Sequence, residues 1–107
     1  MRSELLKGHL DLLLLATLRD EPAHGYAVLQ RLTHLSGGEF DLPEGTIYPA
    51  LHRLERGGLL SSEKSIHRGR MRRTYRLTPA GERAISGKRA EWERFAAGMA
   101  RTLEARG

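Results

Sequence analysis

The stretch from Glu44 to Leu77 allows few folds. Its first part has apolar residues at Ile47, Leu51 and Leu54, a spacing that places all three on one face of a helix. A Gly-Gly pair follows and predicts the end of that helix, because glycine readily adopts the conformation of a helix C-terminus. The opposite face is polar and carries Thr46, Tyr48, His52, Arg53 and Arg56. One face thus suits a protein core, and the other is free to meet a polar partner.

Two strand-like runs follow the predicted helix, at Leu59–Lys64 and Arg72–Leu77, and a basic turn at Ser65–Met71 joins them around a glycine. Side chains alternate along the second run, so Tyr75 should face the core and Arg72 should face outward. A basic helix followed by a basic hairpin is typical of a winged helix-turn-helix, whose helix enters the DNA major groove while the hairpin lies on the backbone. We therefore expect a mainly α fold with a small β-hairpin, of the α+β class, with the winged helix-turn-helix domain at residues 1–77.

The positive charge of the chain is concentrated in this hairpin. The 107 residues hold 18 Lys and Arg against 13 Asp and Glu, a net charge of +5. Between Leu60 and Arg76 there are six bases and one acid, Glu63, so the remaining 12 bases and 12 acids cancel. A localised basic patch favours a polyanionic partner, although a solvated basic loop would have the same composition. The polar helix just upstream favours DNA as that partner.

Two further helices are predicted before this stretch. Leu5–Leu18 is so rich in leucine that it should be buried on most sides, either in its own core alone or between that core and another subunit. His24–Leu35 carries an apolar stripe and is expected to be the first helix of the helix-turn-helix. There His24 is expected to cap the helix, and Tyr26 to pack or to reach a phosphate. Thr46 is the predicted N-cap of the second helix, whose proline would then fall in the first turn.

A long helix is predicted at the C-terminal end, in residues 78–107. Thr78 and Pro79 favour its start, at the N-cap and the first helical position. A helix of about 25 residues is about 37 Å long, more than a small winged-helix body covers. Apolar residues recur along one side of it, at Ile85, Trp92, Phe95, Met99 and Leu103. The simplest cover is the same helix of a second chain, so this segment is predicted to be a dimerisation helix.

Several functional classes find no support in the sequence. There is no cysteine, which excludes disulfides and thiolate zinc sites and fits a reducing cytoplasm. The five histidines lack metal-ligand spacing and no catalytic acid, base or nucleophile set is visible, so we expect no metal, no cofactor and no enzyme activity. The longest apolar run, Leu12–Ala16, is too short for a bilayer, which needs about 20 residues. No signal peptide and no membrane association are predicted.

Four ordered motifs resemble the PadR family of bacterial transcriptional regulators. They are LLKGHLDLLLLATL at Leu5–Leu18, HGYA at His24–Ala27, GTIYPALHRLERGGLL at Gly45–Leu60 and YRLTPAG at Tyr75–Gly81. The resemblance extends from Leu5 to about Ile85, and the single C-terminal helix is similar to that of the short-tailed branch. It implies a homodimeric repressor that binds palindromic double-stranded operator DNA, with the C-terminal helix as dimer arm and release by an effector.

The resemblance also implies roles for individual residues. Tyr48 and its neighbours match groove and phosphate contacts, and Arg70, Arg72 and Arg73 match the wing. The full expected DNA-binding set is Tyr26, Thr46, Tyr48, His52, Arg53, Lys64, Arg68, Arg70, Arg72 and Arg73. In some short-tailed relatives a Trp on the last helix lines a flat drug-binding pore at the dimer centre, and Trp92 is similarly placed. The expected dimer and effector set is Ile85, Trp92, Phe95, Met99 and Leu103, and the effector would be a small planar aromatic molecule.

Two departures from the family pattern concern the wing. Many relatives carry Trp shortly after the Ser-Glu of the first strand, where this chain has Lys64, and the wing here also contains Ile66 and Met71. A rival hypothesis is a winged-helix module that binds another protein, with a shallower salt dependence and no operator preference. A closed dimer interface without room for a ligand is the alternative to an effector site. The operator, the regulated genes, the effector and the direction of regulation do not follow from the sequence.

Overall fold

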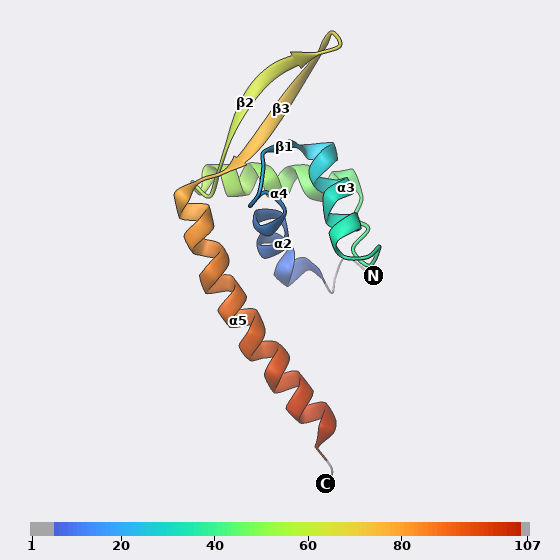
Figure 1. The fold of residues 1–107 in the computed structure, drawn as a ribbon, viewed down its shortest axis with the longest axis vertical. Helices are drawn as coiled ribbons and strands as arrows, with labels where there is room; N and C mark the ends of the chain where they lie inside the picture. The colour runs from blue at the N-terminus through green and yellow to red at the C-terminus, as the bar shows by residue number, and fades with distance from the viewer. Residues whose placement is uncertain (1–5, 106–107) are drawn as a thin grey trace.

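The computed structural model describes residues 6–105, which form a helical body that carries a β-hairpin (Figure 1). The elements are η1 (Lys7–His9), α2 (Leu10–Thr17), β1 (Ala23–His24), α3 (Gly25–Leu35), α4 (Glu44–Arg56), β2 (Leu60–His67), β3 (Arg70–Leu77) and α5 (Pro79–Glu104). The α+β winged-helix fold predicted from the sequence is therefore confirmed. The first predicted helix is a 3-10 turn followed by α2, and its expected start at Leu5 lies outside the described residues, as do residues 1–4 and 106–107.

The sheet has three antiparallel strands in the order β1-β3-β2, and its hairpin is longer than predicted. Pairing of β2 with β3 runs without interruption from Leu60 opposite Leu77 to His67 opposite Arg70. The turn contains two residues, Arg68 and Gly69, with φ of 52° and 76°. Positive φ at both central residues is the type I′ turn, whose twist matches that of the flanking strands. The predicted seven-residue basic turn is thus wrong, because these polar residues alternate and pair as strands rather than forming a loop.

One core joins α2, α3, α4 and the base of the hairpin. The apolar stripe predicted on α4 is buried, and Leu14 and Leu15 of α2 pack with it. Tyr75 of β3 is buried in the same cluster and so seats the hairpin on the helices. Ile85 of α5 also belongs to this core and is 1% exposed. Its own subunit therefore covers Ile85 almost completely, and its predicted place in a dimer contact stays a prediction.

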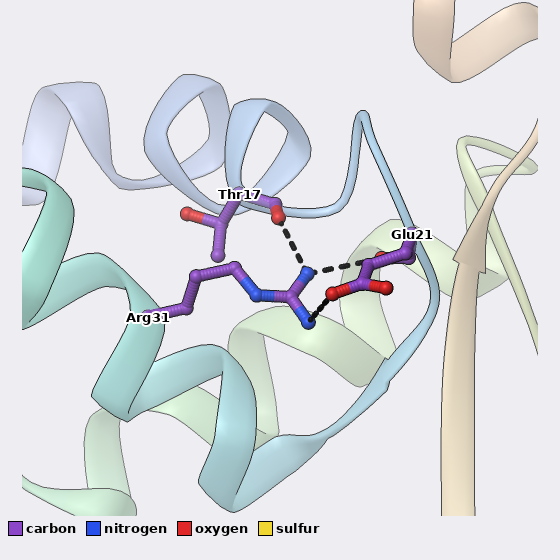
Figure 2. A network of polar contacts seen from close by, with 3 residues as sticks. All are labelled: Thr17, Glu21 and Arg31. Carbon is purple, nitrogen blue, oxygen red and sulfur yellow. Dashed lines mark hydrogen bonds and ion pairs between the residues drawn. The ribbon is translucent and has the colours of Figure 1, made fainter.

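The loop between α2 and β1 is tied to α3 by one arginine (Figure 2). Arg31 Nη1 donates to the backbone carbonyl oxygens of Thr17 and Glu21, each at 3.0 Å, and Nη2 lies 3.5 Å from Glu21 Oε1. A charged donor to two carbonyl groups makes stronger hydrogen bonds than a neutral one. These bonds fix the path of the chain into β1 and hence the start of α3.

The helix α5 packs on the body at its start and projects from it at its C-terminal end. Its start is as predicted: Thr78 Oγ1 accepts a hydrogen bond from Gly81 N–H at 3.0 Å, and Pro79 follows in the first turn. The 26 residues of α5 are about 39 Å long. Its first part packs along α2, whereas its C-terminal half projects from the body at the end opposite the hairpin tip (Figure 1). The large apolar residues that α5 exposes are Trp92, Phe95, Met99 and Leu103.

Candidate nucleic-acid interface

A basic hollow of about 510 Å³ lies between the hairpin and the N-terminal parts of α3 and α4. It opens there because β1 pairs with β3 only at Thr74 and Tyr75, which leaves the edge of β3 beyond them free. Its lining is His24, Gly25, Tyr26, Tyr48, His67, Arg68, Arg70, Met71, Arg72 and Arg73. The hollow therefore brings together the predicted residues of three separate segments, which are 24–26, 48 and 67–73.

The position of Tyr48 in this hollow depends on Gly25. A Cβ atom built on Gly25 would lie 2.4 Å from Tyr48 Cε1 and 2.9 Å from its hydroxyl oxygen. Non-bonded carbon atoms normally stay about 3.5–4.0 Å apart, so any larger residue would displace the ring. Tyr48 is 38% exposed and borders the hollow. The glycine of the HGYA motif thus lets α4 place a tyrosine directly against the start of α3.

His24 caps α3, as predicted. Its Nδ1 accepts a hydrogen bond from Ala27 N–H at 3.3 Å, which requires that nitrogen to be unprotonated. Burial, and then the charges of Arg72 and His67, lower the pKa of His24 below its ordinary value of 6.5. The neutral form that caps the helix is therefore the form favoured by the surroundings. The α3 N-terminus, with its unpaired N–H groups and positive dipole end, adds to the positive potential of the hollow.

The wing arginines have no acidic partner. None of the ion pairs found among residues 6–105 involves Arg68, Arg70 or Arg72, although Arg68 and Arg70 are exposed at the tip. Neighbouring cations of this kind repel one another until an anion lies between them. Lys64 is also exposed on the wing, opposite Arg73, but does not border the hollow. The wing therefore offers a set of uncompensated cations next to Tyr48.

Arg73 has a further role in holding the wing. Its Nη1 donates to Ser62 Oγ at 2.8 Å, and Ser62 Oγ donates to Glu55 Oε2 at 2.5 Å. Glu55 lies near the end of α4, so this chain of hydrogen bonds connects both strands of the hairpin to that helix. These bonds fix the orientation of the wing relative to α4, and one of the three side chains, Arg73, also borders the basic hollow.

Arg53 of α4, which was expected among the DNA-binding residues, does not border this hollow. Its Nη2 pairs with Asp11 Oδ1 of α2 at 2.5 Å. It borders a separate hollow of about 290 Å³ that is also lined by His9, Trp92 and Phe95. Arg53 lies on the side of α4 that is next to α2. The sequence of α4 shows that Arg53 is on the polar face, but not which neighbouring helix that part of the face meets. The structure therefore assigns Arg53 to the contact between α4, α2 and α5.

The predicted start of α4 also needs correction. The helix begins at Glu44 after Pro43, whose carbonyl oxygen accepts the Thr46 N–H at 3.0 Å, and no side chain caps it. Thr46 is therefore not the N-cap but a half-buried residue of the first turn. Pro49 lies inside the helix, where it cannot donate to the carbonyl of Gly45. The fixed φ of Pro43 ends the connecting loop in extended conformation, which starts the helix earlier than the threonine suggested.

The site also contains His52 and four residues that were not predicted. His52 is exposed on α4, and its ring meets Tyr75 edge-on with centroids 6.5 Å apart. The residues that border the hollow but were not among the expected DNA-binding residues are His24, Gly25, His67 and Met71. The strand alternation that places Arg72 outward would also have indicated His67, had the strands been extended to the turn. No sequence signal relates Gly25 to a ring 23 positions further along the chain.

The exposed stripe of α5 borders a second, apolar hollow. This hollow, of about 490 Å³, lies between α2 and α5. Its lining is Leu6, His9, Leu12, Leu13, Ala16, Arg19, Phe40, Ile85, Arg89 and Trp92. The rings of His9 and Phe95 approach each other at its side, with centroids 6.2 Å apart. Trp92, which is 47% exposed, borders both this hollow and the one lined by Arg53.

Within residues 6–105 no group of three or more His, Cys, Asp or Glu side chains is arranged to hold a metal ion. None of the helices that the structure describes combines the length and the apolar character needed to cross a membrane.

Comparison with known proteins gives a consistent result. The model of the transcriptional regulator PadR-like family matches residues 14–87. The transcriptional regulator Rv3488 of Mycobacterium tuberculosis is 43% identical over 77 residues, which are 72% of this chain and 69% of the relative. A PadR family regulator from Eggerthella lenta superposes with a TM-score of 0.83 at 35% identity, covering 96% of this chain and 88% of that one. Bacillus subtilis PadR, solved in complex with operator DNA, shares the fold, with a TM-score of 0.68 at 22% identity over 74% of this chain and 45% of its own.

Proposed function

Since the chain belongs to the PadR-like family of transcriptional regulators, we propose that it represses transcription as a homodimer that binds a palindromic operator. The observation that carries the proposal is the basic hollow, in which wing cations, the N-terminus of α3 and Tyr48 of α4 meet. The family and its relatives are regulators rather than enzymes. We expect the protein to act in the cytoplasm, where bacterial DNA lies.

In this proposal the exposed side of α4 enters the major groove and the wing lies on the neighbouring backbone. His52 and Thr46 on α4 contact base edges, and the arginines of the wing contact phosphates without reading sequence. The hydroxyl group of Tyr48 and the N–H groups at the start of α3 bind a phosphate at the floor of the hollow. The complex of the related Bacillus subtilis protein with operator DNA supports this docking at the level of the fold.

The proposed dimer forms through α5. The exposed apolar residues of α5 are Trp92, Phe95, Met99 and Leu103, of which the first two still border the body beside His9. Isolated exposed apolar residues are ordinary, but four in a stripe on a projecting helix indicate a partner surface. A second copy of α5, related by a two-fold axis, would cover the stripe and set two recognition helices to face successive half-sites. The apolar hollow between α2 and α5 offers the same partner a further contact.

The proposed effector is a small planar aromatic molecule bound beside Trp92. An indole face stacks on planar rings, and the thioether of Met99 adapts to their shape. Such a ligand changes DNA binding only if it favours one spacing of the recognition helices over another. A dimer interface that closes tightly over Trp92 is the alternative. Trp92→Ala abolishes a ligand response in the first case and mainly weakens the dimer in the second.

The salt dependence of operator binding tests the DNA-binding proposal. We expect Arg70→Ala and Arg72→Ala each to weaken binding to all sequences and to reduce the slope of log K against log salt by about 0.9. Arg101→Ala on the exposed end of α5 removes the same charge far from the hollow and serves as the matched control. Fluorescence anisotropy with the DNA upstream of its own gene and with unrelated duplexes gives both slope and preference. A shallow salt slope without operator preference would instead support the protein-interaction module.

A further inference from the structure

Two large apolar side chains stand next to each other at the end of the wing. Ile66 of β2 and Met71 of β3 are directly opposite in the strand register. They are 77% and 68% exposed, although isoleucine and methionine are usually buried. Opposite residues of neighbouring strands point to the same face of the sheet, so the two side chains form one apolar pair. We call Ile66 and Met71 the wing pair.

Cations surround the wing pair. The next residues inward on the same face are Lys64 and Arg73, which are also opposite one another. Beyond the pair toward the tip lies Arg68 in the turn, whereas Arg70 at the start of β3 follows the alternation to the other face of the hairpin. The apolar surface is therefore bounded by positive charge on both sides along the hairpin. A partner that fits it must be apolar at its centre and negatively charged at its edges.

The wing pair is on the recognition side of the hairpin. Met71 borders the basic hollow together with Tyr48 of α4. Its face is also the one on which Tyr75, two pairs further in, packs into the core against the helices. The pair thus lies on the same face of the hairpin as Tyr75, and the hairpin itself projects away from the helices (Figure 1). DNA bound by α4 lies beside this face in the proposed function, on which the following inference rests.

We propose that the wing pair enters the DNA minor groove beside the site read by α4 and wedges into a base step there. Apolar side chains such as isoleucine and methionine unstack base steps in this way, and the kinked duplex then meets more protein surface. Only the two side chains of the wing pair enter the groove, because a two-stranded ribbon needs the wider major groove and the minor groove is about 6 Å wide. Lys64 and Arg70 meet the phosphates that border the groove.

The inference adds a source of specificity to the site. Pyrimidine–purine steps such as TA unstack easily, whereas A-tracts are stiff. The wing pair therefore selects for a deformable step at a position where no protein group hydrogen-bonds to a base. The cationic rim alone contributes affinity that is independent of sequence.

The test uses the full-length protein with Ile66→Thr and Met71→Thr combined, because threonine keeps the β-branched character that strands favour. An operator is first selected from random duplexes by the wild-type protein, and 2-aminopurine is placed at each step under the wing. At saturating protein we expect wild type to raise the fluorescence at one step, and the double variant to leave it as in the free duplex. Wild type should prefer TA over AA at that step by about tenfold, and the variant should bind both alike.

Two controls separate this inference from the proposed function. Leu35→Thr removes another exposed apolar side chain, at the end of α3 away from the hollow, and should behave as wild type. If Arg70→Ala weakens binding while the wing-pair variant keeps both the fluorescence and the TA preference of wild type, only the wedge is wrong. The same unchanged fluorescence and TA preference are expected if the wing pair binds another protein and not DNA. If wild type selects no duplex, the proposed function itself fails.

Discussion

The contact between Gly25 and Tyr48 predicts a variant that folds normally but binds DNA poorly. In Gly25→Ala the new Cβ atom would lie 2.4 Å from the Tyr48 ring, so the ring must move by about 1 Å or more to restore an ordinary contact. The ring is the partly exposed end of a flexible side chain and can turn toward solvent. Alanine also favours the helix by up to about 1 kcal/mol relative to glycine, so the free energy of unfolding should change little.

The loss in DNA binding follows from what the ring does in the hollow. A hydrogen bond from the Tyr48 hydroxyl group to a phosphate contributes about 1.5–3 kcal/mol, so its loss should raise Kd by roughly 10- to 100-fold. Thermal unfolding and anisotropy titrations measure the two effects separately. Gly87→Ala is the matched control, because a Cβ there meets no atom within 4 Å and the site is on the exposed side of α5.

A double-mutant cycle decides whether Gly25 acts through Tyr48. Once Tyr48→Ala has removed the ring, Gly25→Ala should cause no further loss of affinity, because the two changes affect one contact. Additive losses would mean that Gly25 matters for another reason, such as direct approach of the DNA backbone. Unchanged affinity in Gly25→Ala would show that the placement of Tyr48 is not needed for binding.

Three further predictions concern stability. Arg68→Asn should stabilise the hairpin by about 1 kcal/mol, because asparagine tolerates the positive φ of the type I′ turn better than arginine does. The same variant should bind DNA more weakly, and an affinity equal to that of the wild type would show that Arg68 does not contact DNA. Arg31→Leu should lower the free energy of unfolding by about 2 kcal/mol through its lost carbonyl contacts, whereas Glu21→Gln, which affects only an exposed ion pair, should change it little in urea titrations. Because the pKa of His24 is lowered on folding, the unfolded chain takes up the proton first, so stability should fall as the pH drops below 6.5; His24→Asn, a cap that does not titrate, should flatten that part of the profile.

The elements that the sequence predicted correctly are those with a strong local signal. The stripe on α4 and the Thr78-Pro79 start of α5 each depend on neighbouring residues alone, and both are present. The extent of the hairpin was underestimated because charged residues were assigned to a turn, although alternation continues through them up to Arg68. Strand pairing is decided by the partner strand, so the limits of a strand are harder to read than its existence.

The parts of the candidate site that the sequence could not predict depend on contacts between distant segments. Arg53 pairs with Asp11, 42 positions earlier, so its side chain is directed toward α2 rather than toward the basic hollow. Ile85 shares the seven-residue repeat of Trp92 and Met99, but a repeat identifies a helix face and not the surface that covers it. The first turns of α5 lie on their own core, and only the later turns leave it. The apolar stripe of α5 is therefore buried against its own core at Ile85 and exposed from Trp92 onward.

This division of α5 bears on how an effector could reach DNA binding. Trp92 lies where α5 leaves the core, and it borders the hollow that Arg53 of α4 and Asp11 of α2 also line. A ligand beside Trp92 would therefore lie close to an ion pair that holds the recognition helix to α2. Regulation requires a ligand to bind one arrangement of the helices better than another, and the energy available equals that difference in affinity. The Asp11–Arg53 pair is exposed enough that its breakage costs about 1 kcal/mol or less, so even a weakly selective ligand could shift it. Arg53, which was expected to contact DNA, is thus the residue of α4 that borders the hollow beside Trp92.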